Sequence, residues 1–121
     1  MPIERKDSYT DEELGRVDLA ALLAEGIRTP DGKLAGDLQG AGSVAAAVQL
    51  EAGGVATEDL KAGIDALRAG GRPDGPPALA SLVDAGLASA GDDPDDRRFF
   101  VRWLGQVLML MTMRAGARRG G

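Results

Sequence analysis

The chain of 121 residues carries a net charge of −5 and contains neither cysteine nor histidine; it is 44% hydrophobic but only 3% aromatic. Its length fits one domain. Without histidine it lacks the commonest general base and metal ligand, and without cysteine it lacks thiol chemistry, so we expect no enzyme, no cofactor and no metal site. The acidic balance argues against nucleic-acid binding, which usually requires a basic face.

The beginning of the chain is predicted to be a flexible arm over residues 1–9. Its first six residues, Met1-Pro2-Ile3-Glu4-Arg5-Lys6, are largely charged or polar and do not resemble a signal peptide. The longest nearly uninterrupted apolar stretch, 103–113, has about half the roughly 20 residues that a membrane-spanning helix needs. We therefore expect no membrane span and a cytoplasmic protein.

The first predicted helix begins after Thr10. Glu13 stands three residues later, which is the spacing of a capping box, in which the two side chains satisfy each other's backbone amides. The helix is expected to end at Gly26, and Asp18 offers a second cap within it.

The segment after this helix is rich in turn signals. Residues 29–32, Thr-Pro-Asp-Gly, predict a turn, and a small extended hairpin around Pro30 is possible. Residues 40–45 read G-x-G-x-x-A, a pattern that cradles phosphate when a buried strand precedes it. No such strand precedes it here, so a loop followed by a helix cap is the favoured interpretation.

Two helices joined by a Gly-Gly connection are predicted next, over 44–52 and about 57–69. Ser43 and Thr57 are the expected caps, and the pair should form a helical hairpin. The acidic residues Glu58 and Asp59 open the second helix and would repel DNA, which argues against a helix-turn-helix reader. A Pro/Gly loop at 70–77 interrupts the chain, and a short amphipathic helix containing Leu79, Leu82, Val83 and Leu87 follows it.

The last predicted helix, about 94–114, is the most apolar part of the chain. Asp93 should cap it, with Pro94 in its first turn. It contains both phenylalanines, the only tryptophan and three of the four methionines. Because few large side chains lie elsewhere, we expect six of its residues to be divided between the core and an interface: Phe99, Phe100, Trp103, Leu104, Val107 and Met111. A flexible tail is expected at 115–121.

Two charged clusters flank this helix. The acidic cluster 92–96 is of the kind that can hold Mg²⁺ or Ca²⁺, but it lacks the spacing of a calcium loop, and helix capping accounts for it. Arg97, Arg98 and Arg102 precede or enter the apolar stretch, with further arginines after it. They suit a contact with an anionic membrane or nucleic acid, but the favoured interpretation is that these arginines are either solvated or paired with the nearby aspartates.

These patterns predict an all-α domain over 10–114, a small bundle of four to five helices with the 94–114 helix as its central element. The leading functional hypothesis is a non-catalytic interaction or assembly protein: a small acidic subunit, adaptor or inhibitor of a larger bacterial or phage complex. Its partner would be another protein or a second copy of the chain. A helical domain that binds a small molecule is the alternative, and a Mg²⁺-dependent carboxylate enzyme is the third hypothesis.

Overall fold

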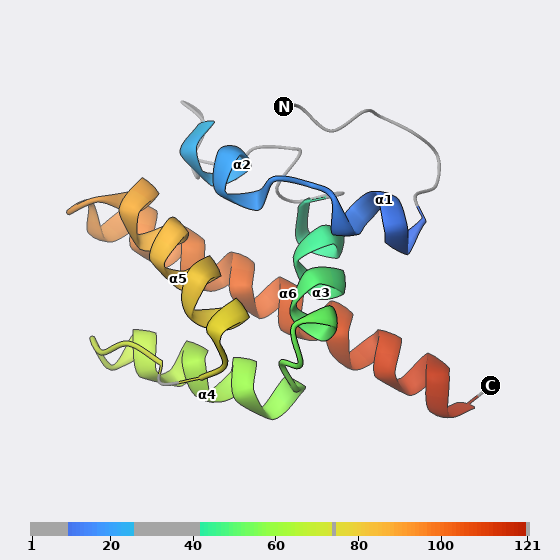
Figure 1. Cartoon of the computed structure of the whole chain (residues 1–121). Helices are drawn as coiled ribbons and strands as arrows, with labels where there is room; N and C mark the ends of the chain where they lie inside the picture. The colour runs from blue at the N-terminus through green and yellow to red at the C-terminus, as the bar shows by residue number, and fades with distance from the viewer. Residues whose placement is uncertain (1–9, 26–41, 74, 121) are drawn as a thin grey trace.

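Six helices and no strand make up the part of the chain that the computed structural model describes, residues 10–25, 42–73 and 75–120. In chain order they are α1 (Asp11–Gly15), α2 (Leu19–Glu25), α3 (Ser43–Ala52), α4 (Thr57–Arg68), α5 (Pro77–Ala90) and α6 (Pro94–Gly120) (Figure 1). The predicted all-α bundle is confirmed. The predicted arm at 1–9 and the turn and hairpin around Pro30 lie outside the described residues.

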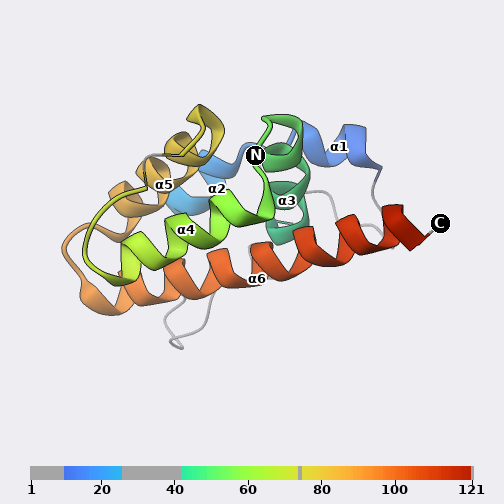
Figure 2. The same cartoon turned by 90° about the horizontal axis from the view of Figure 1, so that it is seen from below.

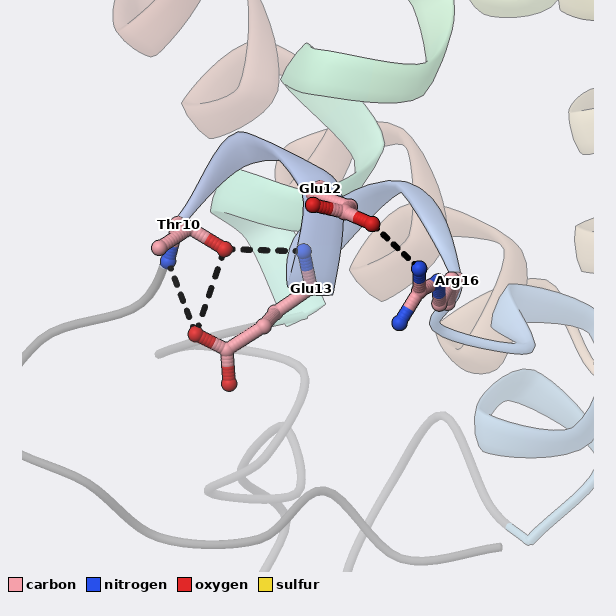
Figure 3. Close-up of polar contacts among 4 residues, drawn as sticks. All are labelled: Thr10, Glu12, Glu13 and Arg16. Atoms are coloured by element: carbon pink, nitrogen blue, oxygen red, sulfur yellow. Dashed lines mark hydrogen bonds and ion pairs between the residues drawn. The ribbon is translucent and has the colours of Figure 1, made fainter.

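The first predicted helix is in fact two short helices, which explains why the bundle has more helices than expected. The capping box is present at the start of α1: the Glu13 amide donates to Thr10 Oγ1 at 3.1 Å, and the Thr10 amide donates to Glu13 Oε1 at 3.2 Å (Figure 3). Beside it, Glu12 pairs with Arg16. The second cap, at Asp18, accepts a hydrogen bond from the Ala21 amide at 3.0 Å. A new helix therefore begins here instead of the first one continuing.

The break between α1 and α2 is fastened to α3 by one side chain. Gln49 Nε2 donates to two carbonyl oxygens there, that of Leu14 in the last turn of α1 at 3.1 Å and that of Val17 in the break at 2.7 Å. The Leu14 carbonyl also accepts from the Val17 amide at 3.2 Å, so the Val17 carbonyl is the one that depends most on Gln49. Gln49 thus connects the N-terminal helices to the rest of the bundle.

Replacing Gln49 with alanine should lower the free energy of unfolding by about 1–3 kcal/mol, because the Val17 carbonyl loses its side-chain donor and the Leu14 carbonyl loses one of its two donors. Urea denaturation followed by circular dichroism measures the change. Glu12→Ala is the matched control, since it removes a polar side chain of similar size from an exposed ion pair and should cost less than about 1 kcal/mol. Equal losses for the two variants would contradict the role given to Gln49.

Helices α3 and α4 follow each other through the Gly53-Gly54 connection, but they do not form the predicted helical hairpin, because both pack on α6 and scarcely contact one another. Neither expected cap acts as one. Ser43 is the first residue inside α3; its side chain is buried and accepts a hydrogen bond from Gln106 Nε2 of α6 at 3.2 Å. Thr57 is likewise inside α4, where the capping contact comes from Asp59, which accepts from the Ala56 amide at 3.0 Å. The prediction of both caps was wrong because burial and an acidic residue in the first turn outweighed local preference.

The turn between α5 and α6 follows the expected chemistry. Gly91 takes a positive φ of 60° at the end of α5. The predicted cap, Asp93, accepts a hydrogen bond from the Asp95 amide at 2.8 Å, and Pro94 is the first residue of α6. At its other end α6 continues past the expected residue 114 to Gly120. Residues 115–120 of this extension are two alanines, two glycines and two arginines, of which alanine and arginine favour a helix and glycine does not.

The core forms where α6 packs against α3, α4 and α5, which makes α6 the central element (Figure 2). Helix α1 packs on α3, and α2 packs on α5. Two kinds of side chain fill this core. The two largest fully buried side chains, Trp103 and Phe100, come from α6, while α3 contributes Ala45, Ala46 and Ala47, all 0% exposed. Small residues let the helix axes approach closely, so large side chains from α6 can fill the remaining volume.

Candidate functional site

The six predicted core-or-interface residues lie mostly on the inner face of α6. Five of them, Phe100, Trp103, Leu104, Val107 and Met111, are at most 2% exposed. Phe99 is partly buried, and the guanidinium of Arg102 lies 5.7 Å from the centre of its ring. The five buried side chains are satisfied within one chain, so a surface for a partner must be sought elsewhere on α6.

The opposite side of α6 carries the exposed apolar side chains. Met109 and Met113 are each 63% exposed. They lie one helical turn apart, with Gly105 one turn before them and Gly116 close after them. We call these four residues the outer face. Sequence analysis noted three methionines in this helix without separating them, although the 100° rotation per residue places Met109 and Met113 on the side opposite to Met111.

A cleft of about 650 Å³ lies between the end of α4 and the first half of α6, which run side by side in Figure 2. Leu67, Leu87 and Val101 contribute apolar side chains to it. Its charged lining residues, among those described, are four arginines: Arg68, Arg97, Arg98 and Arg102. We call this feature the arginine cleft. Sequence analysis singled out the three arginines of α6 but not Arg68, which α4 brings to them.

The structure agrees with the favoured interpretation that these arginines are solvated or paired, since Arg97, Arg98 and Arg102 are all exposed. Arg98 pairs with Asp95, as expected for an arginine beside the acidic cluster. Arg102 instead lies over the Phe99 ring. Arg97 forms no ion pair with the described residues under the usual 4 Å distance limit. The cleft therefore keeps positive charge that the neighbouring aspartates do not fully offset.

The acidic cluster 92–96 acts as a helix cap through Asp93, whose carboxylate also lies 3.4 Å from the Asp96 amide. Asp95 is engaged by Arg98. Within residues 10–25, 42–73 and 75–120, no group of three histidine, cysteine, aspartate or glutamate side chains is arranged to hold a metal ion. Capping and ion pairing account for the contacts that these aspartates make.

The glycine-containing pattern at 40–45 falls partly outside the described residues, because Gly40 and Ala41 are not among them. In the described part, Ser43 is 1% exposed and its hydroxyl accepts from Gln106. That hydroxyl faces α6 in the core and is not available to a phosphate in solvent.

Comparison of the chain with protein-family models, curated proteins and solved structures finds no match. Along the described part of the chain, no helix combines the length and the apolar character needed to cross a membrane. The outer face and the arginine cleft are therefore the two surfaces from which function is inferred.

Proposed function

We propose that this protein is a non-catalytic interaction protein that binds a helix of a protein partner on the outer face of α6. The observation that carries the proposal is the composition of the outer face. Its two exposed methionines lie between Gly105 and Gly116, and packing among the described residues does not require glycine at either position. The absence of histidine and cysteine from the sequence also favours binding over catalysis.

The methionines supply the apolar contact. A side chain that is 63% exposed leaves most of its apolar surface in water, at a cost of about 25 cal/mol per Å² relative to burial. Methionine is enriched in protein interfaces, where its flexible thioether adapts to irregular partner surfaces. Met109 and Met113 together form a raised apolar patch one turn long.

The glycines suggest the shape of the partner. Glycine inside a helix is less favourable than alanine by about 0.5–1 kcal/mol, so it usually serves a packing purpose. A Cβ atom added at Gly105 or Gly116 would meet no other atom of the described residues within 4 Å, so nothing in that part of the chain uses the space. A second helix crossing α6 would use it, because small residues allow two helix axes to approach closely while the methionines pack to either side.

Photo-crosslinking tests this surface on the full chain in the cells that produce it. p-Benzoylphenylalanine placed at Met109 should give a discrete crosslinked product, whereas the same group at Ala62, an exposed position of α4, should not. Adding Gly105→Leu and Gly116→Leu should reduce the product severalfold, because leucine blocks the close approach without touching the core. Mass spectrometry then identifies the partner.

The mass of the product identifies the partner as a different protein or as a second copy of the chain; either supports binding on the outer face. Light scattering of the purified chain checks the second case independently, since self-association must appear there as a higher mass. Yields at 109 that do not exceed those at 62, or that the two leucines leave unchanged, would rule out the proposed surface.

A further inference from the structure

The arginine cleft combines charge and apolar surface contributed by different parts of the chain. Arg68 lies in the last turn of α4, and Arg97 lies in the first turns of α6, about 30 residues later. Between the arginines, Leu67 and Val101 present apolar surface from the same two helices. The net charge of the chain is −5, yet four arginine side chains surround this one concave apolar surface.

The charge of the cleft favours an anion. Guanidinium groups donate hydrogen bonds in a planar fork that matches carboxylate and phosphate oxygens. Like charges gathered in one cleft repel one another, and a bound anion relieves this repulsion most where solvent is displaced. Arg98 already shares its charge with Asp95, which leaves Arg68, Arg97 and Arg102 as the principal donors to a ligand.

The cleft also has an apolar part, which an inorganic anion such as phosphate would leave uncovered. Leu67 is only 6% exposed, and Leu87 and Val101 are partly buried, so the cleft reaches down to the core cluster. Its volume of about 650 Å³ lies within the 300–1,000 Å³ typical of small-molecule sites. No aromatic ring lines it among the described residues, so it offers no stacking platform for nucleic-acid bases.

We propose that the arginine cleft binds a small amphipathic anion, with a phosphate or carboxylate head on Arg68, Arg97 and Arg102 and a short apolar body against Leu67, Leu87 and Val101. Such a ligand is either a free metabolite or the head group and upper chain of an anionic lipid. The site shares no residue with the outer face, but Arg102 lies one turn before Gly105 on the same side of α6. Arg68 and Arg97 are therefore the positions at which ligand binding is tested without altering the outer face.

Titration of the full chain with octyl phosphate tests the proposal by nuclear magnetic resonance and calorimetry. We expect saturable binding with resonance shifts centred on Arg97 and Val101, and an affinity at least tenfold above those of inorganic phosphate and of neutral octyl glucoside. Arg68→Gln and Arg97→Gln should each weaken octyl phosphate binding about tenfold. Arg16→Gln, an exposed arginine of α1, is the matched control and should leave binding unchanged.

Val101→Ser tests how much the apolar part of the ligand contributes to binding, separately from its charged head. It should bring the affinity for octyl phosphate toward that for inorganic phosphate, while retained amide spectra show that the variant is folded. Co-sedimentation with phosphatidylglycerol vesicles would identify a lipid as the source of the ligand, and binding of free octyl phosphate without vesicle binding would identify a soluble metabolite.

Three results would overturn the proposal. The first is an absence of resonance shifts in the cleft, and the second is equal octyl phosphate affinity in the chain carrying both Arg68→Gln and Arg97→Gln. The third is an acidic amphipathic peptide that binds the cleft more than tenfold tighter than octyl phosphate, which would assign the cleft to a protein segment instead.

Discussion

Replacing Trp103 with alanine should lower the free energy of unfolding by about 3–5 kcal/mol, a large share of the stability of an ordinary domain. Trp103 is 1% exposed, and its ring lies 6.0 Å from that of Phe100 in a stacked pair. Removing it leaves a cavity in the core, because the structure around a fully buried side chain relaxes only partly. Urea denaturation followed by circular dichroism at 222 nm measures the loss without relying on the tryptophan signal.

A conservative variant distinguishes packing from a general intolerance of α6 to substitution. Trp103→Phe keeps an aromatic ring beside Phe100 and should retain more than half of the stability that alanine removes. A denaturation midpoint that Trp103→Ala leaves unchanged would mean that α6 does not organise the core, and the inner face would then have to be reconsidered as an interface.

Gly86→Ala should destabilise the chain by about 2 kcal/mol, even though alanine is the better helix former by up to about 1 kcal/mol. Gly86 lies in α5 where it crosses α6, and a Cβ atom there would stand 2.1 Å from two ring carbons of Phe100. That ring is 0% exposed and has no free space into which to move. Overpacking therefore outweighs the gain in helix propensity.

Two further variants test whether overpacking against Phe100 is the cause of the destabilisation by Gly86→Ala. In the background of Phe100→Leu, which removes the ring, Gly86→Ala should become neutral or stabilising, so the double-mutant cycle yields a large coupling energy. Gly105→Ala is the matched control in α6: its Cβ meets nothing, and it should raise the stability of the isolated chain by up to about 1 kcal/mol. If both glycine substitutions stabilise the chain, the close crossing of α5 and α6 would be contradicted.

The parts of the fold that depend on local chemistry were predictable from the sequence. The capping box at Thr10, the Asp93 cap and the apolar spacing of the last helix each require only residues within one or two turns. Helix caps are local because the donor amide and the accepting side chain are at most three residues apart. The all-α class follows from these signals.

Contacts between distant segments were not predictable in the same way. Ser43 is a strong capping residue by preference, yet it is buried beside Gln106, 63 positions later in the chain. The first predicted helix is interrupted where Asp18 caps α2, and Gln49 of α3 donates to the Leu14 and Val17 carbonyls beside that interruption. Sequence periodicity contains no information about which distant side chain will donate hydrogen bonds to the backbone carbonyls where a helix is interrupted.

The same distinction applies to the candidate surfaces. Helical geometry alone places Met109 opposite Met111, so the outer face was accessible to sequence reasoning that applied the 100° rotation to each methionine. The arginine cleft was not, because Arg68 reaches Arg97 only through the packing of α4 along α6. In the sequence, Arg68 is an ordinary basic residue in the last turn of a helix; in the structure it lines the arginine cleft.

The contrast between an alanine-rich α3 and a large-residue α6 implies that the two helices tolerate opposite kinds of evolutionary change. At Ala45, Ala46 and Ala47 any added methyl group would push apart the helices on either side, so drift there is confined to residues no larger than alanine. On the inner face of α6 the loss of volume is the damaging direction. Compensating substitutions are therefore expected in pairs, a larger residue in α3 with a smaller one in α6. Sequences that evolve from this chain should conserve the total side-chain volume at the contact between these two helices.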